Sequence, residues 1–198
     1  NFQVIQNKES YVISGKVFNA SKLIEDLIFK DAENKNIFDD NYSIKIEIDE
    51  VYIDENDTMY DLTGKLNFFN NKIINADINS KFNDNEKVTF TLISKDNQKV
   101  TTFYSDRAKP FVKKFNFVKG FEKGSLDFYS VKKNNLSKSK LKIYDFKLKE
   151  VPALTKILTL ASLQGIADII SGEGIRFTDF EMNFTNKNKL MTINEIYA

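Results

Sequence analysis

The sequence predicts an α+β domain that is mostly β, with one strongly twisted antiparallel sheet and two to four short helices packed on it. Short segments alternate apolar and polar residues between Asn- and Asp-rich turns, which is typical of an antiparallel meander. One long apolar segment, residues 152–171, instead repeats its apolar residues at helical spacing. We therefore expect about nine or ten strands, with an open apolar groove on one face of the sheet.

The composition is that of one domain. The chain has 198 residues with no Pro/Gly/Ser-rich linker, so we expect a single domain over residues 1–198. It starts at Asn1 without a visible signal peptide and stops within the strand-like pattern 193–198, so we expect it to be a fragment of a longer protein. The net charge is +1 and the basic residues are scattered, which argues against a nucleic-acid partner. Cys and His are both absent, which excludes disulfides, Cys/His zinc sites and thiol or imidazole catalysis.

Three segments are predicted to be helical. Asn19 or Ser21 caps the first, near residues 20–30, and Asp106 caps the second, near 107–115. The third covers 152–171 and begins at Pro152, where the missing N–H has no intrahelical partner. Lys156, Gln164, Gly165 and Asp168 interrupt this third segment, so we do not expect it to span a membrane.

Ten further segments are predicted to be strands: 11–16, 42–48, 60–69, 72–82, 87–95, 99–105, 121–132, 139–149, 175–186 and 190–198. Residues 2–5 are a candidate for one more. The apolar phase shifts after Ile48, which indicates a bulge near Asp49–Glu50. A second phase change lies between Ile143 and Tyr144.

Few residues form a pattern that carries chemistry. Gly172 and Gly174 resemble part of a phosphate loop but stand between a helix and a strand, the wrong order, so we interpret them as a turn. The acidic segment 54–57 lacks the glycine, the closing glutamate and the helical flanks of a calcium-binding hand. A glycosidase-like carboxylate pair stays open as an alternative, although no motif singles out two carboxylates. We expect no catalytic residue, metal or cofactor, and no enzyme activity.

The apolar residues of the strands carry more information. Phenylalanine is abundant, with 18 residues, and many of these lie on alternating strands. Such a face is either a core covered by helices or an open groove for lipid acyl chains, and the sequence does not assign which apolar phase faces lipid. The groove candidates are Ile44, Ile46, Leu66, Phe68, Ile78, Phe90 and Leu92.

The C-terminal third resembles the C-terminal region of AsmA-like bacterial envelope proteins of the YhdP type. The resemblance rests on a strand ending in Asp-Phe, a proline-led apolar segment and a G-x-G-I-x-F motif. Its matching residues are Asp145, Phe146, Pro152, Leu154, Leu158, Ala161, Ser162, Leu163, Gly165, Gly172, Gly174, Ile175 and Phe177. Residues 15–27 and 105–115 resemble the family's upstream motifs less closely, with Asn19 in place of the usual Asp and an unusual Pro110.

The resemblance implies a segment of a periplasm-spanning protein that is anchored in the inner membrane by a region absent from this sequence. Members of that family are implicated in phospholipid transport to, and homeostasis of, the outer membrane. Its implied partners are phospholipid and adjacent segments of the same chain, and it supplies no catalytic residue. Pro152, Leu158, Gly165, Gly172, Gly174 and Phe177 are then structural signature residues. The alternative is a structural or interaction module of the cell envelope that carries no lipid, and an enzyme acting on envelope glycans is a third interpretation.

Overall fold

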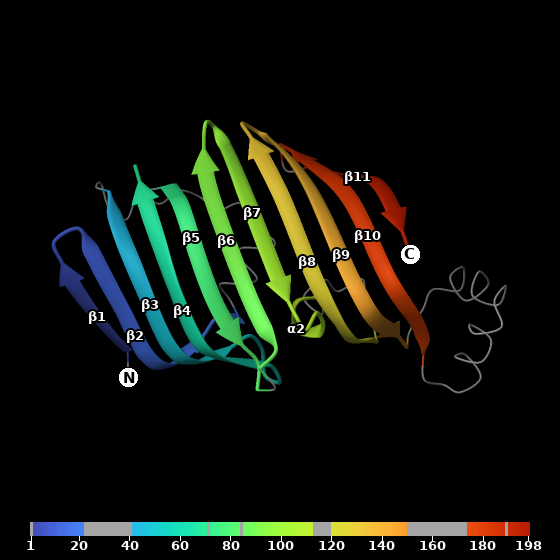
Figure 1. Cartoon of the computed structure of the whole chain (residues 1–198), viewed down its shortest axis with the longest axis horizontal. Coiled ribbons are helices and arrows are strands. Elements are labelled where there is room, and N and C mark those ends of the chain that lie inside the picture. Colours follow the sequence, from blue (N-terminus) through green and yellow to red (C-terminus); the bar gives the residue numbers. More distant parts are fainter. Residues whose placement is uncertain are drawn as a thin grey trace.

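The chain forms one large sheet (Figure 1). The computed structural model describes residues 2–21, 41–70, 72–83, 85–112, 120–149, 174–188 and 190–198. Of these residues, 78% lie in strands and 3% in helix. The elements are β1 (Phe2–Asn7), β2 (Ser10–Asn19), β3 (Tyr42–Tyr52), β4 (Thr58–Phe69), β5 (Lys72–Lys81), β6 (Lys87–Lys95), β7 (Gln98–Ser105), α2 (Lys109–Val112), β8 (Phe121–Lys133), β9 (Leu136–Leu148), β10 (Ile175–Lys187) and β11 (Leu190–Tyr197).

The predicted α+β class is wrong, because the described part of the chain is nearly all β. The helix predicted at 107–115 begins only at Lys109, as α2, because the residues before α2 bond to other partners, and its residues 113–115 lie outside the described residues. The Ser105 hydroxyl donates to the Arg107 carbonyl at 2.8 Å, and the Ala108 N–H donates to the Gly124 carbonyl at 2.6 Å. The predicted helices near 20–30 and at 152–171 lie outside the described residues, apart from the first two residues of the former.

The strands follow one another in space in their order along the chain, and there are eleven rather than nine or ten. All neighbours pair antiparallel except β2 and β3, which are parallel. Residues 20–41 connect these two strands. This length allows the chain to return to the end of the sheet at which β2 begins, as a parallel pair requires. The β6–β7 hairpin instead turns through Asp96 and Asn97, both at positive φ, as a two-residue turn between twisted strands requires.

One row of apolar residues crosses all eleven strands. Residues directly opposite each other on neighbouring strands lie on the same face of a sheet. The pairing therefore aligns a central apolar row, made of Val4, Ile13, Ile46, Gly64, Ile78, Phe90, Phe103, Phe128, Leu141, Met182 and Ile196. We call the face that carries this row the apolar face, and the opposite face the polar face.

In several strands the alternation of apolar and polar residues shifts by one residue. A local change of backbone conformation there keeps the apolar side chains on the apolar face. In β4, Leu62 and Met59 lie three residues apart, and Asp61 between them has a φ of 52°. The register of β4 against β5 shifts at the same place, between Tyr60 and Thr63. The phase change expected at Asp49–Glu50 is present in β3, because Ile48 and Val51 on either side of these residues belong to the same buried cluster. It produces no register shift against β4, since β3 and β4 change phase together.

The second phase change lies in β8 and β9, close to the predicted position. Lys123, Gly124 and Asp145 all have positive φ there. Phe146 can therefore point to the same cluster as Ile143, although three residues separate them. Phe146 stacks on Phe121 and on Phe177, with ring centroids 5.2 and 5.0 Å apart.

Helix α2 packs on the apolar face near the end of the sheet opposite the β6–β7 turn. Phe111 meets Phe103 edge-on, with ring centroids 4.7 Å apart, and also meets Phe82 at 6.5 Å. Phe103 and Phe111 pack against both buried clusters of the apolar face, one around β3–β6 and one around β8–β9. The two residues thus join the clusters into one continuous apolar layer.

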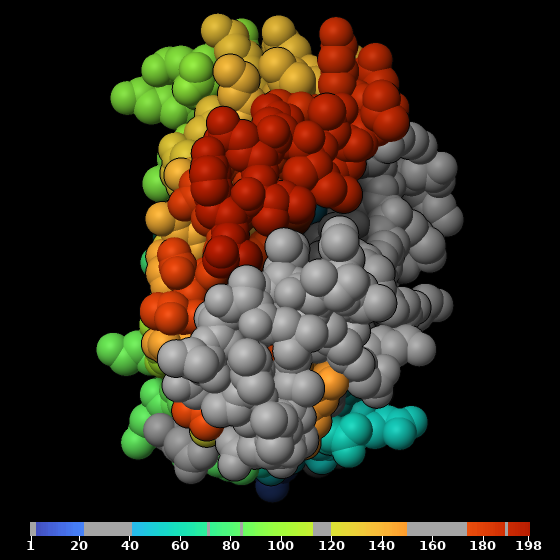
Figure 2. Space-filling model, turned by 90° about the vertical axis from the view of Figure 1, so that its right-hand side faces the viewer, coloured from blue at the N-terminus to red at the C-terminus, as the bar shows by residue number. Residues whose placement is uncertain are grey.

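The sheet has two edge strands, β1 and β11. Figure 2 views the molecule from the β10–β11 end, and β11 pairs only with β10 among the described strands. Large apolar side chains are exposed on β11, including Leu190 at 69% and Ile196 at 54%. Exposed apolar edges of this kind favour pairing with a further strand.

Replacing Gly124 should destabilise the fold. Gly124 has a φ of 80°, and a Cβ added there would lie 2.9 Å from both the Phe146 Cβ and the Tyr144 carbonyl oxygen. We expect Gly124→Ala to lower the free energy of unfolding by about 2–3 kcal/mol, measured by urea denaturation. Ser125→Ala, one residue further along β8, is the control and should change it by less than about 1 kcal/mol. Equal effects of the two variants would contradict the phase change assigned to Gly124.

Candidate functional site: the apolar face of the sheet

All seven predicted groove residues lie on the apolar face of β3–β6. Ile46, Ile78 and Phe90 belong to the central apolar row. Ile44, Leu66 and Leu92 lie on the adjoining row, toward the end of the sheet that holds the β6–β7 turn. Phe68 lies one row further and stacks on Tyr42, with ring centroids 4.4 Å apart. Leu92 is buried, whereas the other six are half-buried.

The sequence prediction missed the continuation of this face over the C-terminal half of the sheet. Phe103, Phe128, Leu141 and Met182 extend the central apolar row across β7–β10. Their signal was present, because each alternates with polar neighbours along its strand. The register that aligns them could not be read from one strand at a time.

Gly64 is the one member of the central row without a side chain. A Cβ there would lie 3.1 Å from the Ile78 Cγ1 and 3.2 Å from the Asp77 carbonyl oxygen. Glycine therefore lets Ile78 lie close to β4, and the row remains filled across this position.

Two of the six signature residues fall within the described part of the chain. Gly174 precedes β10 at a φ of 88°, where an added Cβ would lie 2.7 Å from the Leu148 carbonyl oxygen. Phe177 packs against the cluster of the apolar face that includes Phe146. Both have structural roles at the start of β10. Pro152, Leu158, Gly165 and Gly172 lie outside the described residues.

The apolar face becomes polar toward the hairpin end of the sheet, which we define as the end with the β6–β7 and β8–β9 turns. Beside the central apolar row lies a hydroxyl row, where Thr101, Ser130 and Ser139 are paired across β7–β9. The Ser130 and Ser139 hydroxyl oxygens are 2.9 Å apart, within hydrogen-bond distance. The next row is a lysine row, made of Ser94, Lys99, Lys132, Ser137 and Asn186.

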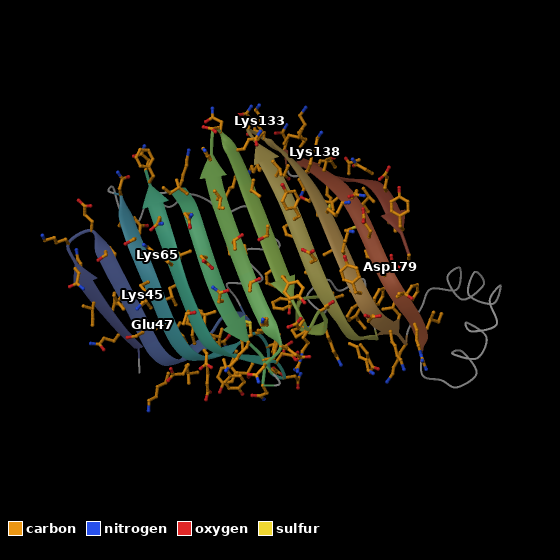
Figure 3. All side chains as sticks on the ribbon, in the orientation of Figure 1. Lys45, Glu47, Lys65, Lys133, Lys138 and Asp179 are labelled. Atoms are coloured by element: carbon orange, nitrogen blue, oxygen red, sulfur yellow. The ribbon has the colours of Figure 1, made fainter. Side chains whose placement is uncertain are left out.

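The polar face carries charged side chains, and some of them form ion pairs. The ammonium of Lys45 lies 2.6 Å from the Glu47 carboxylate on the same strand, next to Lys65 on β4 (Figure 3). A shallow depression of about 480 Å³ lies here, over β2–β5, and its lining includes Thr63, Lys65 and Asp77. It is open and mixed in charge, so it offers no concentrated site for one ligand.

Glu181 is the most strongly perturbed acid of the polar face. Its carboxylate lies 2.7 Å from the Lys140 ammonium and 3.0 Å from that of Lys142, and it accepts a hydrogen bond from the Asn183 amide. These hydrogen bonds, that of Lys140 first, lower the pKa of Glu181 to about 2. The same contact raises the pKa of Lys142. The ion pairs of Glu181 with Lys140 and Lys142 link β10 to β9 on the polar face.

The described residues hold no group of three or more acidic side chains arranged to bind a metal ion. The acidic segment before β4 is a turn, in which the Asp54 carboxylate accepts hydrogen bonds from the Asn56 and Asp57 backbone N–H groups. No helix in the described part of the chain is long and apolar enough to cross a membrane. The candidate site is the extended apolar face of the sheet.

Comparison of the chain with protein-family models, with curated proteins and with solved structures finds no match. The geometry and chemistry of the sheet are thus the basis for a functional proposal.

Loss of the Glu181 charge should change how stability depends on pH. The folded-state pKa of Glu181 lies below its ordinary value of 4.5, so its contribution is present above about pH 4.5 and is lost as the pH falls toward about 2. We expect Glu181→Gln to be less stable than the wild type at pH 7, with the difference shrinking toward pH 2. Urea midpoints measured across this range provide the test.

The control is Asp179→Asn on the same strand. Asp179 is exposed and makes no ion pair among the described residues. This variant should differ little from the wild type at either end of the range. A stability difference for Glu181→Gln that persists unchanged at pH 2 would contradict the assigned ion pairs.

Proposed function

We propose that this domain binds acyl chains along the apolar face of its sheet, as a segment of a bridge-like phospholipid transporter of the bacterial envelope. The observation that carries the proposal is the central apolar row, which crosses all eleven strands while the polar face carries charges. A row of this kind offers an acyl chain a continuous contact and requires neither a metal nor a catalytic group.

The exposure of the row also supports binding. Ile46, Ile78 and Phe90 are half-buried, unlike the fully enclosed residues Ile53 and Phe82 near the opposite end of the sheet. Half-buried apolar side chains in a continuous row gain free energy when a ligand removes them from water, by roughly 25 cal/mol for each Å² covered. Burial on this face is uneven, because residues around α2 are enclosed and Leu92 and Ala76 in the adjoining row are also buried, whereas these three members of the central row keep part of their surface exposed.

The cellular setting follows from the resemblance of the C-terminal third to AsmA-like proteins. On that basis we propose a periplasmic location, with inner-membrane anchoring by a region outside this sequence. Adjacent segments of the same chain are the proposed partners of the sheet edges, since β11 exposes apolar residues and has a free hydrogen-bonding side in the described structure.

The second candidate is a structural or interaction module of the envelope that carries no lipid. The observation that favours it is the exposed apolar edge, where Leu190 and Tyr197 are 69% and 57% exposed. Such a module would use its edges for pairing and its apolar face as an ordinary core. The two candidates differ in whether the apolar face itself takes up a ligand.

Lipid recovery from the purified protein separates the two candidates. We expect native mass spectrometry and solvent extraction to recover bound phospholipid from the wild type. Phe90→Gln places an amide in the central apolar row and should reduce recovered lipid about tenfold, because burying an unpaired amide costs about 1–3 kcal/mol. Ile93→Gln is the matched control, since Ile93 lies on the polar face of the same strand, 53% exposed.

Urea denaturation of both variants completes the experiment. In an open groove, Phe90→Gln loses lipid and keeps most of its stability when compared in the lipid-free state. In a closed core it lowers stability by several kcal/mol. A wild-type protein free of lipid, together with a strongly destabilised Phe90→Gln, would reject the transport proposal in favour of the interaction module.

A further inference from the structure

We propose that Lys99 and Lys132 bind the phosphate-type anionic head of an amphiphile whose acyl chain lies along the apolar face. The inference rests on the proposed function, because it concerns the same face. It adds the charge of the ligand head and the direction in which the ligand lies, with its head at the hairpin end and its chain on the central apolar row.

The first argument is the order of side chains along β7 and β8. On β7 the apolar face presents Phe103, then Thr101, then Lys99. On β8 it presents Phe128, then Ser130, then Lys132 at the paired positions. Residues two apart on a strand are separated by roughly 6.7 Å, so about 13 Å separates the aromatic row from the lysine row. An amphiphile shows the same order of apolar chain, polar linkage and charged head.

The second argument is the like charge of the two lysines. Lys99 and Lys132 are directly opposite each other across β7 and β8, where side chains leave the sheet about 5 Å apart. Two like charges at such a pair destabilise the sheet. Burial, and then the charge of Lys132, lower the pKa of Lys99, and no described carboxylate forms an ion pair with it. An anion between the two would offset their like charge.

The third argument is the face on which the two lysines lie. Neither Lys99 nor Lys132 makes an ion pair with any described residue. Polar-face lysines such as Lys65, Lys133 and Lys138 also make none with a described residue, but they lie on the face away from the apolar row. Lys99 and Lys132 differ because they lie on the face that we assign to the ligand.

The hydroxyl row completes the site. The Ser130 and Ser139 hydroxyls lie between the lysine pair and the central apolar row. Their oxygens share one hydrogen bond, which leaves the second hydroxyl proton able to donate to a ligand oxygen. Ser94 and Ser137 flank the lysine pair in its own row. Lysine ammonium groups beside hydroxyl donors match the oxygen atoms of a phosphate.

Calorimetric titration with three probes tests this site. The probes are dodecyl phosphate, dodecyl maltoside and inorganic phosphate, with both amphiphiles kept below their micelle concentrations. We expect dodecyl phosphate to bind the wild type roughly tenfold more tightly than dodecyl maltoside, and inorganic phosphate to bind far more weakly than either. K99Q/K132Q should remove the tenfold preference and leave the affinity for dodecyl maltoside unchanged.

The control is K133Q/K138Q, which also removes two positive charges near the hairpin end, from β8 and β9. Lys133 and Lys138 are exposed and occupy polar-face positions on β8 and β9. Both lie at the hairpin end (Figure 3). This variant should keep the preference for dodecyl phosphate. Circular dichroism and urea midpoints show whether each variant remains folded.

The outcomes separate this inference from the proposed function. If both amphiphiles bind and K99Q/K132Q keeps the tenfold preference, the head site is overturned while chain binding stands. If the two double variants lose the preference equally, general electrostatic attraction explains it and the head site is also overturned. If inorganic phosphate binds as tightly as dodecyl phosphate, the lysine pair is a free-anion site. If neither amphiphile binds, the proposed function fails.

Discussion

Cross-strand register is the constraint on which the rest of this structure depends. The central apolar row exists because ten successive pairings align one residue of each strand, from Val4 on β1 to Ile196 on β11. A slip of one residue at any pairing would turn the following strands over and divide the face. Residues with positive φ in β4, β8 and β9 help to meet this constraint. At these positions the alternation of apolar and polar residues shifts by one, yet the apolar side chains stay on the same face.

The apolar face differs in chemistry between the two ends of the sheet. Near α2, the contacts of Phe111 with Phe103 and Phe82 close the apolar layer, and the fully enclosed residues gather there. Toward the hairpin end the same face passes through hydroxyl groups to the Lys99–Lys132 pair. A ligand that lay in the inferred direction would place its chain on the half-buried residues of the central row and its head where no described carboxylate pairs with the lysines. On the polar face, pairs such as Lys140 with Glu181 link neighbouring strands.

The sequence predicted the local features of this fold better than its long-range ones. Alternation in each strand and the Asn/Asp turns, such as Asp96–Asn97, identified the strands because period-two patterning and left-handed turn residues act locally. The phase change near Ile143 was visible for the same reason. The parallel pairing of β2 with β3 could not be predicted, since it depends on where residues 20–41 return the chain. All seven groove candidates lie on one face of the sheet. The position of Phe103, Phe128 and the lysine pair on that face could be assigned only from the cross-strand register.

The most direct measurement is photo-crosslinking with palmitate that carries a diazirine along its chain, followed by peptide mapping of the adducts. The account predicts adducts on the apolar-face residues of β5–β8, centred on Ile78, Phe90 and Phe103. These three are consecutive, half-buried members of the central row. Adducts confined to the exposed edge residues of β11 or to the polar face would contradict it, because the apolar face would then be a core and not a ligand-binding surface.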